Sequence, residues 1–260
     1  MPDSPSHHAD LLLIDVGNTS IKLALCDYQK PIHHERRELA TREVDGDGIN
    51  ATLKGWSWDG IVLCSVVPKT NVVFEHALGG GGRMHLVSSQ SPLGVGVDYP
   101  RPETIGADRL ANAAAVNVLY GTPAIVLDFG TALTFDVVSA KRGYIGGVIV
   151  PGLGTMLEYF SGRTALLPRI ELAEPEHAIG RSTEEAMRSG AVFGYRGLAR
   201  EILVRVKKEL LDGDMTENVA IVATGGHAAL IAKGLPEINT VDADLTLIGL
   251  RIIGEKHFCG

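Results

Sequence analysis

Cysteines, aromatic side chains and long apolar runs are all scarce in this sequence of 260 residues. Phe, Trp and Tyr together make up 5% of the chain, so a core must be built mostly from aliphatic side chains. The cysteines Cys26, Cys64 and Cys259 are odd in number and lack the spacing of a metal site, which is typical of reduced thiols. No apolar run is long enough to span a membrane, and the N-terminus lacks the basic region of a signal peptide. We therefore expect a soluble cytoplasmic protein with no membrane partner.

Positive charge is also in short supply. Lys and Arg number 24 against 31 Asp and Glu, which makes the net charge −7. A general nucleic-acid binder needs a clustered basic surface to displace counterions, so this balance disfavours nucleic acid as a partner. Hydrophobic residues make up 45% and charged residues 21%, a composition typical of a folded domain rather than a disordered chain.

Several common catalytic signatures are missing. The sequence has no GxxxxGKS/T loop, no GxSxG elbow, no HExxH pair and no paired CxxC motif. A P-loop, a hydrolase-type nucleophile and a zinc-protease site therefore have no support in this chain.

The apolar pattern predicts alternating strands and helices over a length that fits one large domain or two modest ones. Residues 1–9 are predicted to be a disordered leader. Gly190, Gly194 and Gly197 on one long predicted helix indicate close packing against another element. The main strands are expected at 10–16, 21–26, 61–67, 84–88, within 124–138 and at 143–153, and the helices at 71–78, 106–120, 183–211 and 245–258.

An internal repeat indicates the architecture. When the segment around Asp15 is aligned with the segment around Asp128, Gly17 falls on Gly130. Each of the two segments consists of an apolar strand, a glycine turn and a second apolar strand. We therefore expect a duplicated α/β fold, with mixed sheets flanked by helices and a cleft between domains at 10–120 and 121–260. In this hypothesis Asp15 and Asp128 face one shared pocket.

The two repeated turns carry the first candidate binding residues. Backbone N–H groups of a glycine turn can surround phosphate oxygens, Lys22 adds a cation, and Asp15 could hold Mg²⁺ directly or through water. Thr131 and Thr134 add hydroxyl groups in the second copy. Taken alone, the first turn is equally an ordinary Asx-turn hairpin. The repeated Asp favours a ligand site, because a carboxylate at the end of a buried strand is costly unless something binds it.

Two further segments suggest chemistry. Gly225 and Gly226 would let a flat nucleoside ring approach the backbone, although Gly-Gly is also a plain strand-to-helix turn. Asp108, at a predicted helix start, could accept a proton from a hydroxyl during phosphoryl transfer, and Arg109 could bind a carboxylate. The alternative is that the helix dipole favours Asp108 there and that Arg109 lies on a solvated face.

These segments, in this order, resemble the type III pantothenate kinase family of the acetate and sugar kinase, heat-shock cognate and actin superfamily, whose domains are ribonuclease H-like. The resemblance covers nearly the whole chain, from about Asp10 to Ile253. It rests on the segments DVGNTSIK (15–22), YPRPETIGADR (99–109), DFGTALT (128–134) and ATGGHA (223–228).

The resemblance implies a role for each matching position. Asp108 would be the general base, with Tyr99, Gly106, Ala107 and Arg109 holding pantothenate. Asp128 would bind a monovalent cation, K⁺ or NH₄⁺, and Thr183 would reach pantothenate across a homodimer interface. ATP would be held by Asp15, which also lies near Mg²⁺, and by Val16, Gly17, Asn18, Thr19, Ser20, Ile21, Lys22, Thr131, Thr134, Gly225 and Gly226.

Three functions remain in competition. The resemblance implies an enzyme that transfers the γ-phosphate of ATP to pantothenate, giving 4′-phosphopantothenate, the first step of coenzyme A biosynthesis. The alternatives are a nucleotide-binding transcriptional accessory protein and a related kinase acting on a sugar. An enzyme needs Asp15, Asp108 and Asp128 together, and this chain carries all three.

Overall fold

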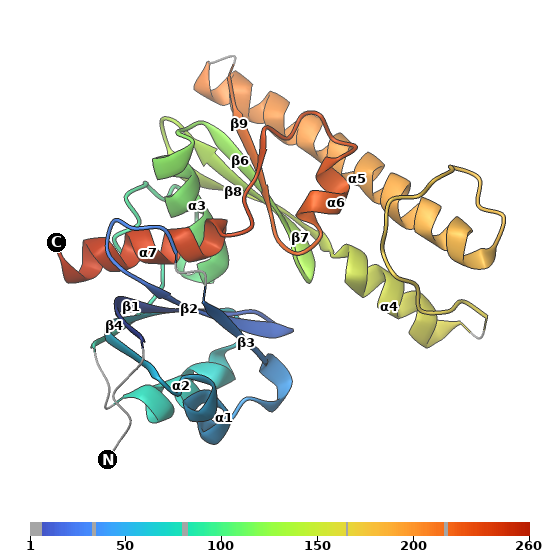
Figure 1. Ribbon diagram of the computed structural model, residues 1–260. Helices are drawn as coiled ribbons and strands as arrows, with labels where there is room; N and C mark the ends of the chain where they lie inside the picture. The colour runs from blue at the N-terminus through green and yellow to red at the C-terminus, as the bar shows by residue number, and fades with distance from the viewer. Residues whose placement is uncertain (1–6, 33–34, 80–82, 165, 216–217) are drawn as a thin grey trace. The chain divides into compact units, whose positions relative to one another are not determined.

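The computed structural model describes residues 7–32, 35–79, 83–164, 166–215 and 218–260. The chain divides into two compact units (Figure 1). Unit 1 comprises residues 1–119 and 244–260, and unit 2 comprises residues 120–243.

Unit 1 is built on a mixed five-stranded sheet in the order β3-β2-β1-β4-β5. The strands β1, β2 and β3 form an antiparallel meander, whereas β4 and β5 continue parallel to β1. The strands are β1 (His7–Val16), β2 (Ser20–Cys26), β3 (Arg36–Ala40), β4 (Trp56–Ser65) and β5 (Arg83–Leu86).

Helices cover both faces of this sheet, which explains why the middle of β1, from Leu11 to Ile14, is apolar at every position (Figure 1). Leu11 and Leu13 pack on one face against α3 and α7. Leu12 and Ile14 pack on the opposite face, where α1 and α2 lie. The helices are α1 (Gly46–Thr52), α2 (Pro68–Leu78), α3 (Ala107–Leu119) and α7 (Leu245–Phe258), with short 3₁₀ turns η1 (Thr41–Glu43) and η2 (Pro102–Thr104).

Unit 2 repeats the strand connectivity of unit 1. Its order is β10-β9-β6-β7-β8, with β6, β7 and β8 antiparallel and β9 and β10 continuing parallel to β6. The predicted duplicated α/β fold is therefore confirmed. The strands are β6 (Ala124–Phe129), β7 (Ala132–Ser139), β8 (Gly143–Pro151), β9 (Ala220–Thr224) and β10 (Thr240–Val241), and the helices are α4 (Leu153–Arg163), α5 (Thr183–Asp214) and α6 (Ala228–Ala232).

The predicted boundaries differ from the structure in two places. His7, His8 and Ala9 belong to β1 and pair with β4, so the leader predicted at 1–9 is wrong for these three residues; residues 1–6 lie outside the described part. The last helix, α7, belongs to unit 1 rather than to the second half, because Leu250 and Ile253 pack with Leu11 and Leu110. The sequence position of α7 could not reveal this return to unit 1.

The prediction for the glycines of α5 is also wrong within the described residues. A Cβ atom at Gly190, Gly194 or Gly197 would meet no heavy atom within 4 Å, so this glycine face is open. The predicted start of the helix is confirmed, since the Ser182 side chain caps it by accepting a hydrogen bond from the Glu185 N–H at 3.2 Å.

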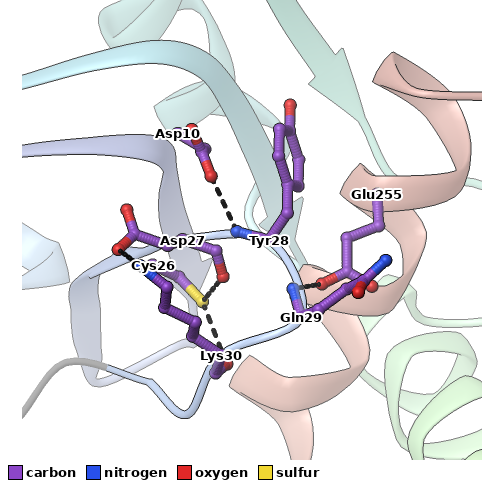
Figure 2. Close-up of polar contacts among 7 residues, drawn as sticks. All are labelled: Asp10, Cys26, Asp27, Tyr28, Gln29, Lys30 and Glu255. Carbon is purple, nitrogen blue, oxygen red and sulfur yellow. Dashed lines mark hydrogen bonds and ion pairs between the residues drawn. The ribbon is translucent and has the colours of Figure 1, made fainter.

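The loop after β2 lies near the amino-terminal half of β1, at the opposite end of the strands from the carboxyl end of β1 (Figure 2). The Tyr28 N–H donates to Asp10 at 2.8 Å, and the Gln29 N–H donates to Glu255 of α7 at 2.6 Å. Buried Cys26 donates its thiol to the Asp27 carbonyl. These contacts attach the loop to β1 and α7, far along the strands from the repeated turn at Gly17.

The contact between α3 and α7 can be tested with one methyl group. A Cβ at Gly249 of α7 would overlap the carbonyl oxygen of Ala111 in α3. We expect Gly249→Ala to lower the free energy of unfolding by about 1–3 kcal/mol in urea denaturation, as overpacked cores do. The control is Gly213→Ala on α5, where a Cβ meets nothing within 4 Å; it should raise the same quantity by about 0.5–1 kcal/mol. Unchanged stability of Gly249→Ala would contradict the packing.

Candidate active site

The first repeated turn joins β1 to β2. Asp15 lies one residue before the end of β1 and pairs in register with Lys22 of β2. The Gly17 N–H donates to the Ser20 carbonyl at 3.0 Å, and the Thr41 hydroxyl donates to the Gly17 carbonyl at 2.8 Å. The turn is therefore held from two sides.

The predicted phosphate-binding stretch 15–22 divides into two kinds of residue. Asn18 and Thr19 are exposed at the tip of the turn, and Ser20 is half-buried. Val16 and Ile21 are fully buried, in the cluster between the sheet and α1 and α2. Their side chains serve the core, so a phosphate could be reached there only by backbone groups.

Asp15 has an unusual electrostatic environment. The pKa of its carboxyl group is raised from 3.8 to about 6. Burial is the largest cause of this rise, and the nearby charge of Asp108 contributes to it. The charge of Lys22 and a hydrogen bond from Cys64, its partner in register on β4, act on this pKa in the opposite direction. Two carboxyl groups from β1 and α3 thus interact in unit 1, and a bound cation would favour their ionised forms.

Asp108 is the second residue of α3. The backbone N–H of Arg109 donates to its Oδ1 at 2.8 Å, and burial raises the pKa of this carboxyl group against the smaller opposing effect of Arg109. A Cβ at Gly106 would lie 2.5 Å from the same oxygen, so a larger residue at this position would displace the Asp108 carboxylate. A carboxyl group whose pKa is raised is better suited to accept a proton near neutral pH.

A hollow of about 510 Å³ lies beside this helix start. It opens at the carboxyl ends of β4 and β5, and the predicted substrate residues Gly106 and Ala107 line it. Tyr99 and Arg109 are half-buried and lie outside its lining, so their contact with a substrate stays a prediction. The other lining residues are Ser65, Val66, Val87, Ser88, Ser89, Gln90, Pro102, Glu103, Thr104 and Ile105.

In unit 2 the structure brings Asp128 and Gly225 together. Asp128 near the end of β6 pairs in register with Thr134 of β7 and Thr224 of β9. Gly225 follows β9 with φ +90°, and a Cβ there would lie 2.6 Å from the Asp128 carboxylate. Only glycine fits this position, because it tolerates both the positive φ and the close approach. Gly226 has open space around its Cα.

Thr131 lies in the second repeated turn and is exposed. Its carbonyl oxygen accepts hydrogen bonds from the Gly152 N–H at 3.0 Å and from the Thr155 hydroxyl at 2.9 Å. His227 lies near the same region, since its N–H donates to the Phe129 carbonyl at 3.2 Å. Gly152, Thr155 and His227 were not predicted as site residues, although the Pro151-Gly152 turn was a visible signal.

The structure gives the positions of Thr134 and Thr183 but no contact that bears on their predicted roles. The Thr134 hydroxyl lies 3.5 Å from the buried Asp136 carboxylate, on the same face of β7. Thr183 is exposed at the first position of α5. Because Asp15 and Asp108 belong to unit 1 and Asp128 to unit 2, the shared pocket stays a prediction. No helix in the described part of the chain is both long and apolar enough to cross a membrane.

Comparison with known proteins gives a consistent result. A family model described as type III pantothenate kinase matches residues 11–205. The type III pantothenate kinase of Akkermansia muciniphila is 49% identical over 93% of this chain and 96% of its own length. That of Methylacidiphilum infernorum is 40% identical, covering 94% and 88%.

Solved structures with the same fold are more distant in sequence. A Baf family transcriptional activator from Campylobacter jejuni matches with a TM-score of 0.61 at 17% identity, over 95% of this chain and 98% of that one. A 2-dehydro-3-deoxygalactonokinase from Sinorhizobium meliloti matches with a TM-score of 0.59 at 13% identity, over 95% and 97%. At these identities the likeness shows the fold alone.

The environment of Asp15 predicts a pH-dependent stability. Because its pKa is raised from 3.8 to about 6 on folding, Asp15 contributes stability that is present below about pH 4 and lost as the pH rises through about 6. In metal-free buffer, Asp15→Asn should therefore match the wild type near pH 4 and exceed its free energy of unfolding by about 1–3 kcal/mol near pH 8. Chemical denaturation at both pH values measures this.

The matched control is Asp59→Asn, which removes a carboxylate whose side chain is 65% exposed at β4. Its effect should be within about 0.5 kcal/mol at both pH values, as for most surface substitutions. A loss of stability in Asp15→Asn near pH 8 would contradict the electrostatic account.

Proposed function

We propose that this chain, which belongs to the type III pantothenate kinase family, transfers the γ-phosphate of ATP to the primary hydroxyl of pantothenate. The product is 4′-phosphopantothenate, and the reaction is the first step of coenzyme A biosynthesis. The observation that carries the proposal is the pairing of Asp108, at the start of α3, with the phosphate-type turn that follows Asp15. A proton acceptor and a phosphate-binding turn thus belong to one site in unit 1.

The proposed chemistry assigns one task to each group. The primary hydroxyl oxygen of pantothenate attacks the γ-phosphorus, the bond to the β–γ bridging oxygen breaks, and ADP leaves. The hydroxyl proton passes to the Asp108 carboxylate, whose raised pKa favours this transfer. Arg109 follows Asp108 directly and would bind the carboxylate of pantothenate through its forked donors. Tyr99, Gly106 and Ala107 would orient the substrate.

ATP would be bound by both repeated turns. The tip residues Asn18 and Thr19 and the side chain of Lys22 would contact phosphate oxygens in unit 1. In unit 2, Thr131 would contact the nucleotide, and the open backbone at Gly225 and Gly226 would accept the flat nucleoside. These assignments rest on the match of each residue to the family pattern and on the exposure of the turn residues.

The two repeated carboxylates suit different cations. Asp15 beside Asp108 fits Mg²⁺ held through phosphate oxygens and water, because a divalent cation would favour the ionised forms of these two buried carboxyl groups. Mg²⁺ would neutralise charge on the phosphates during transfer. Asp128 pairs in register with Thr134 and Thr224 rather than with a cationic residue, an environment of oxygen ligands that fits K⁺ or NH₄⁺.

A homodimer would complete the proposal. Gly190, Gly194 and Gly197 leave one face of α5 open, and the large side chain of Phe193 is 40% exposed beside them. Small residues spaced three and four apart permit a second helix to approach closely. Thr183, the predicted pantothenate contact, is the first residue of the same helix. A second copy of the chain that packs on this face of α5 would therefore lie along the helix that carries Thr183.

The cellular setting follows from simpler features. Cys26, Cys64 and Cys259 are free thiols, which fits the reducing cytoplasm that we propose for the enzyme. The net charge of −7 disfavours nucleic acid as a partner. The likeness to a Baf family transcriptional activator does not favour a regulatory role, because it extends to the fold alone.

Steady-state ADP release tests the proposed reaction. The purified protein should release ADP only when pantothenate is present, and omission of Mg²⁺ or of K⁺ should each lower the rate. Asp108→Asn should retain the fold and lose about 100-fold or more in kcat, since general-base groups typically supply roughly 10²–10⁴-fold. The control Asp59→Asn should keep the wild-type rate. Full activity of Asp108→Asn would remove this residue from the base role, and a sugar accepted in place of pantothenate would overturn the substrate assignment.

The dimer is tested by Phe193→Glu, which places a charge on the open face of α5. We expect sedimentation equilibrium to change from dimer to monomer, because an unpaired charge buried at an interface is costly. Val204→Glu is the control, since Val204 is also exposed on α5, at 53%, but lies about two helical turns beyond Gly197. A monomeric wild type would refute the proposed dimer.

A further inference from the structure

The hollow beside Asp108 has two distinct walls. One wall is formed by the segment from Pro102 to Ala107, which includes predicted substrate residues and leads directly to Asp108. The other wall is the turn Ser88–Gln90, which follows β5 and matches no part of the family pattern considered above. The ends of β4 and β5 supply the rest of the lining. The reaction proposed for Asp108 assigns no role to this second wall.

The second wall is held in place by buried polar contacts. Ser91 is buried, and its hydroxyl oxygen accepts the Ser88 N–H at 2.9 Å. The same hydroxyl lies 2.8 Å from Nε2 of His85 on β5. Burial lowers the pKa of His85 to about 4, so near neutral pH its uncharged ring can accept the Ser91 proton.

His85 is itself supported by α7. Its ring stacks on that of His257, with centroids 3.9 Å apart and an angle of 27° between the ring planes. The support of the turn thus runs from α7 through His85 and Ser91 to Ser88, within unit 1. A wall fixed by internal contacts before a ligand arrives needs little ordering on binding, which favours affinity.

The chemistry of the lining indicates what the hollow can hold. Its polar groups are mostly neutral, namely the hydroxyls of Ser65, Ser88, Ser89 and Thr104 and the amide of Gln90. Val66, Val87 and Ile105 supply apolar surface, and Glu103 is the charged residue of the lining. A negative group in the hollow would be repelled by Glu103, whereas an uncharged segment with methyl groups, a hydroxyl and an amide would find partners.

Pantothenate contains such a segment between its reactive hydroxyl and its carboxylate. On the basis of the function proposed above, we propose that the Ser88–Gln90 turn is the second wall of the acceptor site and that Gln90 is a specificity-determining residue that hydrogen-bonds the acceptor's amide. His85 is then a positioning residue that acts through Ser91. The carboxylate of the acceptor points away from Glu103 and out of the hollow.

The test is the Michaelis constant for pantothenate. Gln90→Ala should raise KM for pantothenate about three- to tenfold, the loss of one neutral hydrogen bond. Its kcat should stay within about twofold, because the bond is made equally before and during transfer, and KM for ATP should not change. Glu103→Gln should lower KM for pantothenate. The control is Gln29→Ala, in the loop at the opposite end of the strands (Figure 2), which should leave all three constants unchanged.

The positioning role has its own readout. His85→Phe keeps a ring for stacking but removes the contact with Ser91, and it should raise KM for pantothenate as Ser91→Ala does. The two changes should not add in the double variant, because both break the same contact. Additive effects, or effects on kcat alone, would overturn the positioning role of His85.

The outcomes separate this inference from the proposed function. Pantothenate-dependent turnover by the wild type, together with unchanged KM in Gln90→Ala, would overturn the inference alone. Absence of pantothenate-dependent turnover in the wild type would overturn both.

Discussion

The withdrawal of the Asp15 carboxyl group from water, beside a second carboxyl group on Asp108, is the interaction on which the candidate site depends. Burial and the neighbouring charge both disfavour ionisation of Asp15, and Lys22 and the Cys64 thiol offset part of this effect. Such an arrangement lowers the stability of the ligand-free protein near neutral pH, and it is the kind of strain that a cation and phosphate groups relieve on binding. The same burial makes Asp108 a better proton acceptor. These two buried carboxyl groups of unit 1 would thus serve the two tasks proposed for them, cation binding at Asp15 and proton acceptance at Asp108.

The position of Asp108 depends on α7, the last helix of the described chain. Helix α3, which carries Asp108, packs on α7, and Gly249 allows the close approach at Ala111. The Thr246 hydroxyl donates to the side chain of buried Asn112 at 2.9 Å, so the contact is polar as well as apolar. The last helix also supports the turn that lines the hollow, through the stack of His257 on His85. Unit 1 is therefore completed only after unit 2 has been synthesised, and its site depends on segments from both ends of the sequence.

The two units share one sheet topology but differ in the residues that surround the repeated aspartate. The strand connectivity is the same in both, and each places an aspartate near the end of the strand that begins its meander. The residue paired with that aspartate differs: Asp15 faces Lys22, whereas Asp128 faces Thr134. The cationic partner suits the phosphate site proposed beside Asp15, and the oxygen-bearing partners suit the monovalent cation proposed at Asp128. Duplication preserved the backbone frame, and the side chains at equivalent register positions set the electrostatics.

The sequence by itself determined the elements and motifs that local physics specifies. Apolar runs bounded by glycine predicted the hairpins of Asp15 and Asp128, their common spacing predicted the duplication, and the helical pattern over 183–211 predicted the start of α5. Only the tertiary structure decided the return of α7 to unit 1, the seating of Gly225 on Asp128, the open glycine face of α5 and the role of His85 in supporting a wall of the hollow. Each of these depends on which distant segments pack together, and that choice is made by burial and steric fit across the whole fold rather than by any local pattern.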